Sequence, residues 1–147
     1  MTRFAAQPPH AGEGETGKGN GALTLDWLPP LPQTAYDELL WACDLNFVRG
    51  EDSLVRALWA GQPFVWQIYP QHDGAHHAKL QAFLDWLRAP ASLRGFHRVW
   101  NGIDSAPLPA PDWPEWRACV QAARQRLLAQ PDLASQLMDF VRGKQIK

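Results

Sequence analysis

The chain has 147 residues, a formal net charge of −1 at pH 7, and 46% hydrophobic residues. This length predicts one domain with a substantial apolar core, although the chain need not be a complete protein. A net charge so close to zero excludes the broad basic field with which proteins bind nucleic acids or anionic membranes. We therefore expect no nucleic acid and no membrane among the partners, and we expect partners to be recognised locally.

The two cysteines, Cys43 and Cys119, lie far apart and match no metal-binding or redox spacing. Both are predicted to be reduced thiols in the core. The sequence shows neither a signal peptide nor an apolar run of the length that crosses a bilayer. Together these features favour a reducing cytoplasm as the compartment.

Residues 1–21 are polar and small, and residues 12–21 include five glycines. Such a stretch buries too little apolar surface to offset the conformational entropy lost on ordering, so it is predicted to be a mobile Gly-rich segment or loop. The pair Gly17-Lys18 lacks the Ser or Thr and the preceding strand of a phosphate-binding P-loop. The domain itself is expected to comprise residues 22–147 and to begin with a short strand over residues 22–28.

The central stretch, residues 44–71, is predicted to fold as strand, turn, helix and strand. The strands are expected over residues 44–48 and 64–69, with a helix over residues 54–60 between them. The second strand is almost continuously apolar, which is typical of a parallel strand covered on both faces. The expected buried stripe of the helix consists of Leu54, Val55, Leu58 and Trp59. Because ligands of open parallel sheets bind at the carboxyl ends of strands, the site is expected where these two strands end.

The turn between the first strand and the helix, residues 49–53, is the strongest candidate for a site. Unpaired backbone N–H groups and the positive end of the dipole make a helix N-terminus suitable for a phosphate or diphosphate. Two interpretations of Glu51 and Asp52 stay open. They either only favour the helix dipole, or they bind sugar hydroxyl groups while Ser53 and the backbone face the phosphates and the neighbouring arginines balance the charge.

Polar residues also end the second strand. Tyr69 and Gln71 are candidate contacts for a base or a ribose, whereas Gln67 is predicted to be a buried polar residue. Histidines around a helix start are commonly exposed and no zinc-protease spacing is present, so we predict no metal at the cluster of His72, Asp73, His76 and His77. No histidine is placed by spacing beside Ser53, and we predict no catalytic nucleophile in this chain and no cofactor.

Four further helices are predicted over residues 75–88, 92–100, 113–130 and 132–142. Ser92 is expected to cap the second of them. The last helix is expected to bury Leu133, Leu137 and either Phe140 or Val141. The solvated helix faces are expected to carry Arg94, His97, Arg98, Arg117, Arg124 and Arg126.

The longest motif runs from Cys43 to Ser53 and reads CDLNFVRGEDS. Matching runs follow it at Val55-Arg56-Ala57, Trp59-Ala60-Gly61, Pro63-Phe64-Val65-Trp66, Ile68-Tyr69-Pro70-Gln71, His76, Lys79-Leu80 and Ala82-Phe83-Leu84. This pattern resembles the bacterial elongation factor P maturation arginine rhamnosyltransferases. The resemblance implies an α/β fold, with a Rossmann-like parallel sheet flanked by helices, similar to the C-terminal half of a GT-B glycosyltransferase.

The resemblance also implies an activity, which is the transfer of rhamnose from dTDP-β-L-rhamnose to an arginine of elongation factor P with inversion. The donor nucleotide is bound by the C-terminal half, and this chain looks like that half. The donor-binding residues that follow by position are Arg49, Gly50, Glu51, Asp52, Ser53, Tyr69 and Gln71. The aspartates that activate the acceptor in the family lie in the N-terminal half and have no counterpart here. The general base is therefore expected outside this chain, and the chain alone is expected to be inactive.

Two functions from different classes follow from these observations. The first is the nucleotide-sugar-binding half of a protein-arginine rhamnosyltransferase. The alternative is a non-catalytic α/β domain that binds an anion or presents a Trp-rich face to a protein partner. Binding of the nucleotide sugar distinguishes the two.

Overall fold

The computed structural model describes residues 16–18, 24–72 and 74–144. The chain divides into two compact units, Met1–Tyr36 and Asp37–Lys147, which are described separately.

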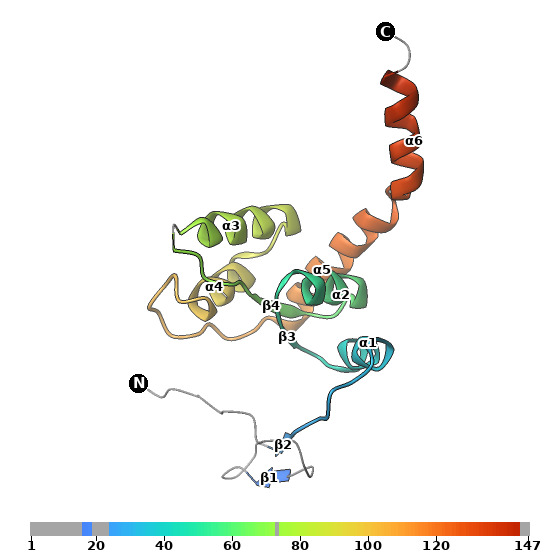
Figure 1. The fold of residues 1–147 in the computed structure, drawn as a ribbon. Helices are drawn as coiled ribbons and strands as arrows, with labels where there is room; N and C mark the ends of the chain where they lie inside the picture. The colour runs from blue at the N-terminus through green and yellow to red at the C-terminus, as the bar shows by residue number, and fades with distance from the viewer. Residues whose placement is uncertain (1–15, 19–23, 73, 145–147) are drawn as a thin grey trace. The chain divides into compact units, whose positions relative to one another are not determined.

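In the first unit, β1 (Thr16–Lys18) pairs antiparallel with β2 (Thr24–Asp26), as labelled in Figure 1. The predicted strand over residues 22–28 is therefore present in part. The prediction of a Gly-rich loop is wrong for residues 16–18, which form a strand, and its other residues lie outside the described part.

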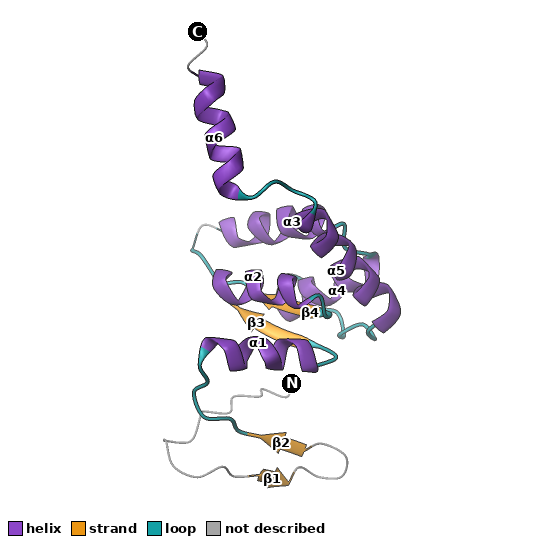
Figure 2. Ribbon diagram, turned by 90° about the vertical axis from the view of Figure 1, so that its right-hand side faces the viewer, coloured by secondary structure: helices purple, strands orange, loops and turns teal. Residues whose placement is uncertain are grey.

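The second unit is built on a parallel strand–helix–strand. After α1 (Gln33–Ala42), which begins in the first unit, come β3 (Asn46–Arg49), α2 (Glu51–Ala60) and β4 (Phe64–Gln67). The strands lie side by side (Figure 2), with Asn46 opposite Phe64 and Arg49 opposite Gln67. The predicted parallel pairing is confirmed. The helix begins at Glu51, earlier than the predicted Leu54, because the glycine at position 50 ends the strand at once.

The core of this unit lies between the strands and the helices. Phe64, Val65 and Trp66 are almost completely buried, and α2 contributes Leu54, Ala57 and Leu58. The prediction that Val55 and Trp59 complete the buried stripe is wrong, since these side chains are 49% and 43% exposed. The small Ala57 occupies the centre of the buried face, so the stripe is turned away from Val55 and Trp59.

Four helices follow β4 in the described part of the chain, as the sequence predicts. They are α3 (Ala75–Leu87), α4 (Ala91–Trp100), α5 (Trp113–Leu128) and α6 (Leu133–Lys144). The buried residues of the first three recur at helical spacing. They are Leu80, Leu84, Leu87, Leu93, Phe96, Trp116, Val120 and Ala123.

The last helix differs from its prediction. α6 is present, but the expected burial of its apolar residues is wrong, because Leu133 is 80% exposed and Leu137 and Phe140 are each 59% exposed. Pro131 precedes the helix, and α6 extends away from the other helices of this unit in Figures 1 and 2. Helical periodicity in the sequence shows that an apolar face exists, but not what covers it.

The outer edge of β4 is closed by the side chains of His97, on α4, and of Asn101, which directly follows α4. The backbone N–H of Trp66 donates to Nε2 of His97 (3.1 Å), and the backbone N–H of Ile68 donates to Oδ1 of Asn101 (2.9 Å). The amide of Asn101 in turn donates to the carbonyl oxygen of Trp66 (2.9 Å). Two side chains one helical turn apart thus take the place that a neighbouring strand would occupy.

His97 is not on a solvated face, so that prediction is wrong. Its side chain is fully buried, and Nδ1 lies 3.0 Å from the carbonyl oxygen of Leu93. Burial disfavours the charged imidazolium and lowers the pKa of His97 to about 4. The ring is therefore neutral at pH 7, with its proton on Nδ1 and with Nε2 free to accept from Trp66.

Two smaller predictions also change. Ser92 does not cap α4, which begins at Ala91; instead it accepts from the indole of Trp116 (2.9 Å) and donates to Glu115 (2.9 Å). Both cysteines are free, but Cys43 is exposed and not in the core. Among the described helices, none has the length and apolar character needed to cross a membrane.

Candidate functional site

The turn between β3 and α2 requires the glycine at its centre. Gly50 has φ +81°, a backbone conformation that other residues adopt only with strain. A Cβ atom added to Gly50 would lie 3.2 Å from the ring of Tyr69. The sequence therefore places glycine here for two reasons, and the close approach brings the end of β3 against the residue that follows β4.

Trp66 fixes this turn from inside the protein. Its indole N–H donates to the carbonyl oxygen of Gly50 (3.1 Å), and its ring, which is 1% exposed, packs edge-on against Phe83. No side chain of the described residues caps α2. Among the described residues, the backbone N–H groups of Asp52 and Ser53 have no protein partner. They stay available to an external acceptor at the positive end of the helix dipole.

The two acids at the start of α2 are each held by one cation. Oε1 of Glu51 lies 2.5 Å from Nζ of Lys79, and Oδ2 of Asp52 lies 3.1 Å from Nε of Arg56. The hydrogen bond and charge of Lys79 lower the pKa of Glu51. The Arg56 guanidinium also holds Asp37 at 2.8 Å. Within the described residues, each of the two acids keeps one oxygen without a side-chain partner.

Arg49 is the cation of the turn that no carboxylate neutralises in the described part of the chain. Its guanidinium lies 4.7 Å from the centre of the Tyr69 ring, within the range of a cation–π contact. Both side chains are exposed. The structure thus brings together Arg49 and Tyr69, which the sequence placed at the ends of two different strands.

Gln71 is the other residue predicted to contact the ligand at the end of the second strand. The backbone N–H of Gln71 donates to Nδ1 of His76 (3.1 Å), and the Gln71 side chain is exposed. No hydrogen bond joins Gln71 to the turn at residues 49–53 among the described residues. The predicted burial of Gln67 is wrong: this last residue of β4 is exposed, whereas the neighbouring Trp66 and Ile68 are buried.

Metal ligation finds no support at this site. No group of three His, Cys, Asp or Glu side chains within the described residues is arranged to hold a metal ion. Asp73, one member of the histidine-rich cluster considered from the sequence, lies outside the described residues.

Two residues of this arrangement were missed from the sequence. From the sequence, Trp66 and Lys79 belong only to runs that match the family, and neither has an expected role in the site. Neither could be linked to the turn by spacing, because Lys79 is 28 residues from Glu51 and Trp66 is 16 residues from Gly50. One feature of the sequence does point to such a lysine: two acids beside an anion site require nearby cations to balance their charge.

The chemistry of the turn suits an anion that also carries hydroxyl groups. Arg49 and two backbone N–H groups offer positive charge and donors, while the carboxylates, already paired, offer acceptor oxygens at little cost in repulsion. No residue in this group is an unpaired general base.

Comparison with known proteins identifies the family of this chain. A model of the family described as "Elongation-Factor P (EF-P) rhamnosyltransferase EarP" matches residues 2–142. The protein-arginine rhamnosyltransferase of Pseudomonas putida is 46% identical over 146 residues, which cover 92% of this chain and 38% of the relative. The protein of the same name from Pseudomonas aeruginosa is 45% identical over 135 residues, which cover 81% of this chain and 34% of the relative.

The fold is also similar to a solved structure. A chain described as "Structural basis for EarP-mediated arginine glycosylation of translation elongation factor EF-P" superposes with a TM-score of 0.72 at 39% identity. The match covers 95% of this chain and 46% of the solved one. The chain thus spans less than half the length of these relatives. Nevertheless, the family match extends over nearly all of its residues, and the chain belongs to the EarP family of elongation factor P rhamnosyltransferases.

Proposed function

We propose that this chain is the nucleotide-sugar-binding half of a protein-arginine rhamnosyltransferase, equivalent to the C-terminal half of a GT-B enzyme. The observation that carries the proposal is the turn at residues 49–53, where, within the described part of the chain, Arg49 has no carboxylate partner and adjoins a helix start without a side-chain cap. The proposed donor is dTDP-β-L-rhamnose, and the proposed acceptor is an arginine of elongation factor P. Family membership supports both.

The proposed roles follow from the chemistry of each group. Arg49, the N–H groups of Asp52 and Ser53, and the Ser53 hydroxyl would bind the diphosphate. This is where negative charge grows as dTDP departs, so donors fixed in advance stabilise the transition state. The oxygens of Glu51 and Asp52 that have no side-chain partner among the described residues would accept hydrogen bonds from sugar hydroxyl groups. Tyr69 and Gln71 would bind the base or the ribose.

The acids of the turn are unsuited to serve as the general base. Glu51 is bound by Lys79 and its pKa is lowered, so its carboxylate has little tendency to accept a proton. Asp52 is bound by Arg56. The acceptor arginine stays protonated at neutral pH, so its activation requires a strong, well-placed base. We propose that this base lies in the part of the family's chain that this sequence does not span.

Titration calorimetry with dTDP-β-L-rhamnose tests donor binding. We expect saturable binding that is weakened in Asp52→Ala and Ser53→Ala. Asp139→Ala, which changes an exposed acid on α6, is the control that should leave binding unchanged. Absence of saturable binding, or binding unaffected by both site substitutions, would contradict the proposal. Equally tight binding of inorganic pyrophosphate would instead favour the anion-binding module.

A second experiment tests the proposed reaction. The chain is incubated with elongation factor P and dTDP-β-L-rhamnose, with and without the N-terminal half of the Pseudomonas putida relative. We expect mass spectrometry to detect a deoxyhexose on an arginine only when both halves are present. Modification by this chain alone would show that the base lies within it, contrary to the assignment above.

A further inference from the structure

Lys79 contacts the candidate site from a different element. It lies on α3, one turn after that helix begins, and its ammonium group is 2.5 Å from Oε1 of Glu51. The two side chains are 49% and 60% exposed, respectively. Exposed ion pairs of this kind add little to folding stability. Stability therefore gives a poor account of this pair, which instead determines where the Glu51 carboxylate lies.

Trp66 gives this ion pair a rigid support. The Lys79 ammonium lies 5.8 Å from the centre of the buried Trp66 ring, and the indole N–H of the same ring holds the carbonyl oxygen of Gly50. Glu51 is thus constrained from two sides. Its backbone follows the fixed carbonyl of Gly50, and its carboxylate is held by Lys79.

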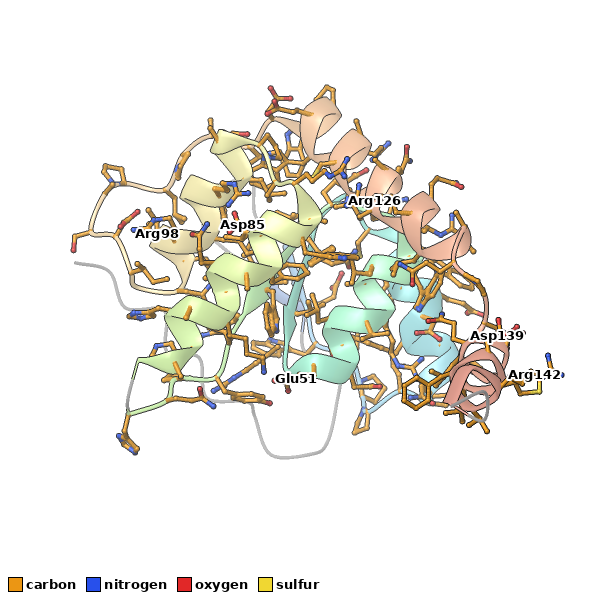
Figure 3. All side chains as sticks on the ribbon, turned by 90° about the horizontal axis from the view of Figure 1, so that it is seen from above. Glu51, Asp85, Arg98, Arg126, Asp139 and Arg142 are labelled. Carbon is orange, nitrogen blue, oxygen red and sulfur yellow. The ribbon has the colours of Figure 1, made fainter. Side chains whose placement is uncertain are left out.

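The two carboxylate oxygens of Glu51 differ in their side-chain partners. Oε1 is occupied by Lys79, while Oε2 has no side-chain partner among the described residues. The charge of the carboxylate is balanced locally, so it repels a neighbouring phosphate less than a free carboxylate would. Figure 3 shows Glu51 at the start of α2, apart from the Asp139–Arg142 pair on α6.

We infer that Lys79 is a positioning residue of the proposed donor site, which holds Oε1 of Glu51 and thereby presents Oε2 to a hydroxyl group of the nucleotide sugar. This inference rests on the proposed function. Lys79 acts through Glu51 and does not itself contact the diphosphate. The role requires an ammonium or guanidinium group on α3, and it disappears when Glu51 loses its negative charge.

Calorimetry on the full chain with dTDP-β-L-rhamnose tests this role through five variants, one of which is Glu51→Gln alone. Lys79→Met should weaken binding about tenfold, which is the loss expected for one charge-assisted hydrogen bond. Lys79→Arg should restore most of the affinity. Adding Lys79→Met to Glu51→Gln should cause no further loss, because the partner through which Lys79 acts is already neutral. Arg142→Met, which removes a distant positive charge, should bind like the unsubstituted chain.

A second readout does not depend on the ligand. The carboxyl carbon of Glu51, followed by NMR as pH is varied, should titrate at a higher pH in Lys79→Met than in the unsubstituted chain. Binding losses that simply add in the double variant would overturn the inference, because Lys79 would then contact the donor directly. Donor binding unchanged by Lys79→Met would overturn it while leaving the proposed function intact. Absence of donor binding by the unsubstituted chain would overturn both, even if the NMR titration shows the ion pair.

Discussion

Buried His97 makes the stability of this protein depend on pH in a defined range. An unburied histidine has a pKa near 6.5, whereas burial lowers the pKa of His97 to about 4 in the folded chain. Between these pH values, His97 is protonated in the unfolded chain but neutral in the folded chain. The contribution of neutral His97 to folding stability is fully present above about pH 6.5, and it is lost as the pH falls to about 4. A difference of about 2.5 pKa units corresponds to about 3 kcal/mol of unfolding free energy.

Urea denaturation followed by tryptophan fluorescence measures this loss. Between about pH 7 and pH 4, the unsubstituted chain should lose about 3 kcal/mol more stability than His97→Gln, which has no imidazole to protonate. The comparison removes the contribution of carboxylates such as Asp104, whose pKa is lowered by its hydrogen bonds from Arg98, because both proteins contain them. His72→Gln, which changes an exposed histidine, should behave like the unsubstituted chain. Equal losses in His97→Gln and the unsubstituted chain would refute the reasoning.

Four further substitutions test the fold of the chain. Gly50→Ala should destabilise the chain by at least about 1 kcal/mol in urea unfolding, because φ is positive and the Tyr69 ring is close; unchanged stability would contradict that geometry. Asn101→Ala should cost about 1–3 kcal/mol, since it removes the side-chain partner of the Ile68 N–H and of the Trp66 carbonyl. Leu137→Ser on α6 should change stability by less than about 0.5 kcal/mol, whereas Leu84→Ala in the core should cost about 2–5 kcal/mol.

The central strand–helix–strand could be predicted because its signals are local. The apolar run at residues 64–66 and the glycine at position 50 each determine the backbone close to themselves. The same holds for the meeting of Arg49 and Tyr69, which follows once the two strands are parallel.

The remaining features depend on packing between distant segments. A histidine on a charged helix face becomes buried because it supplies an acceptor to a strand 31 residues away. The apolar residues of α6 satisfy the periodicity of a packed helix, yet periodicity does not identify a partner. The link from Lys79 through Trp66 to the turn likewise depends on where α3 lies, which no local pattern determines.

The central claim is that the turn at residues 49–53 binds a nucleotide sugar. Amide NMR shifts during titration with dTDP-β-L-rhamnose test it most directly, because they locate the ligand residue by residue. We expect saturable shifts concentrated at Gly50, Asp52, Ser53 and Tyr69, with no change on α6. Shifts that cluster elsewhere, or no shifts at saturating donor, would contradict the assignment of this turn as the donor site.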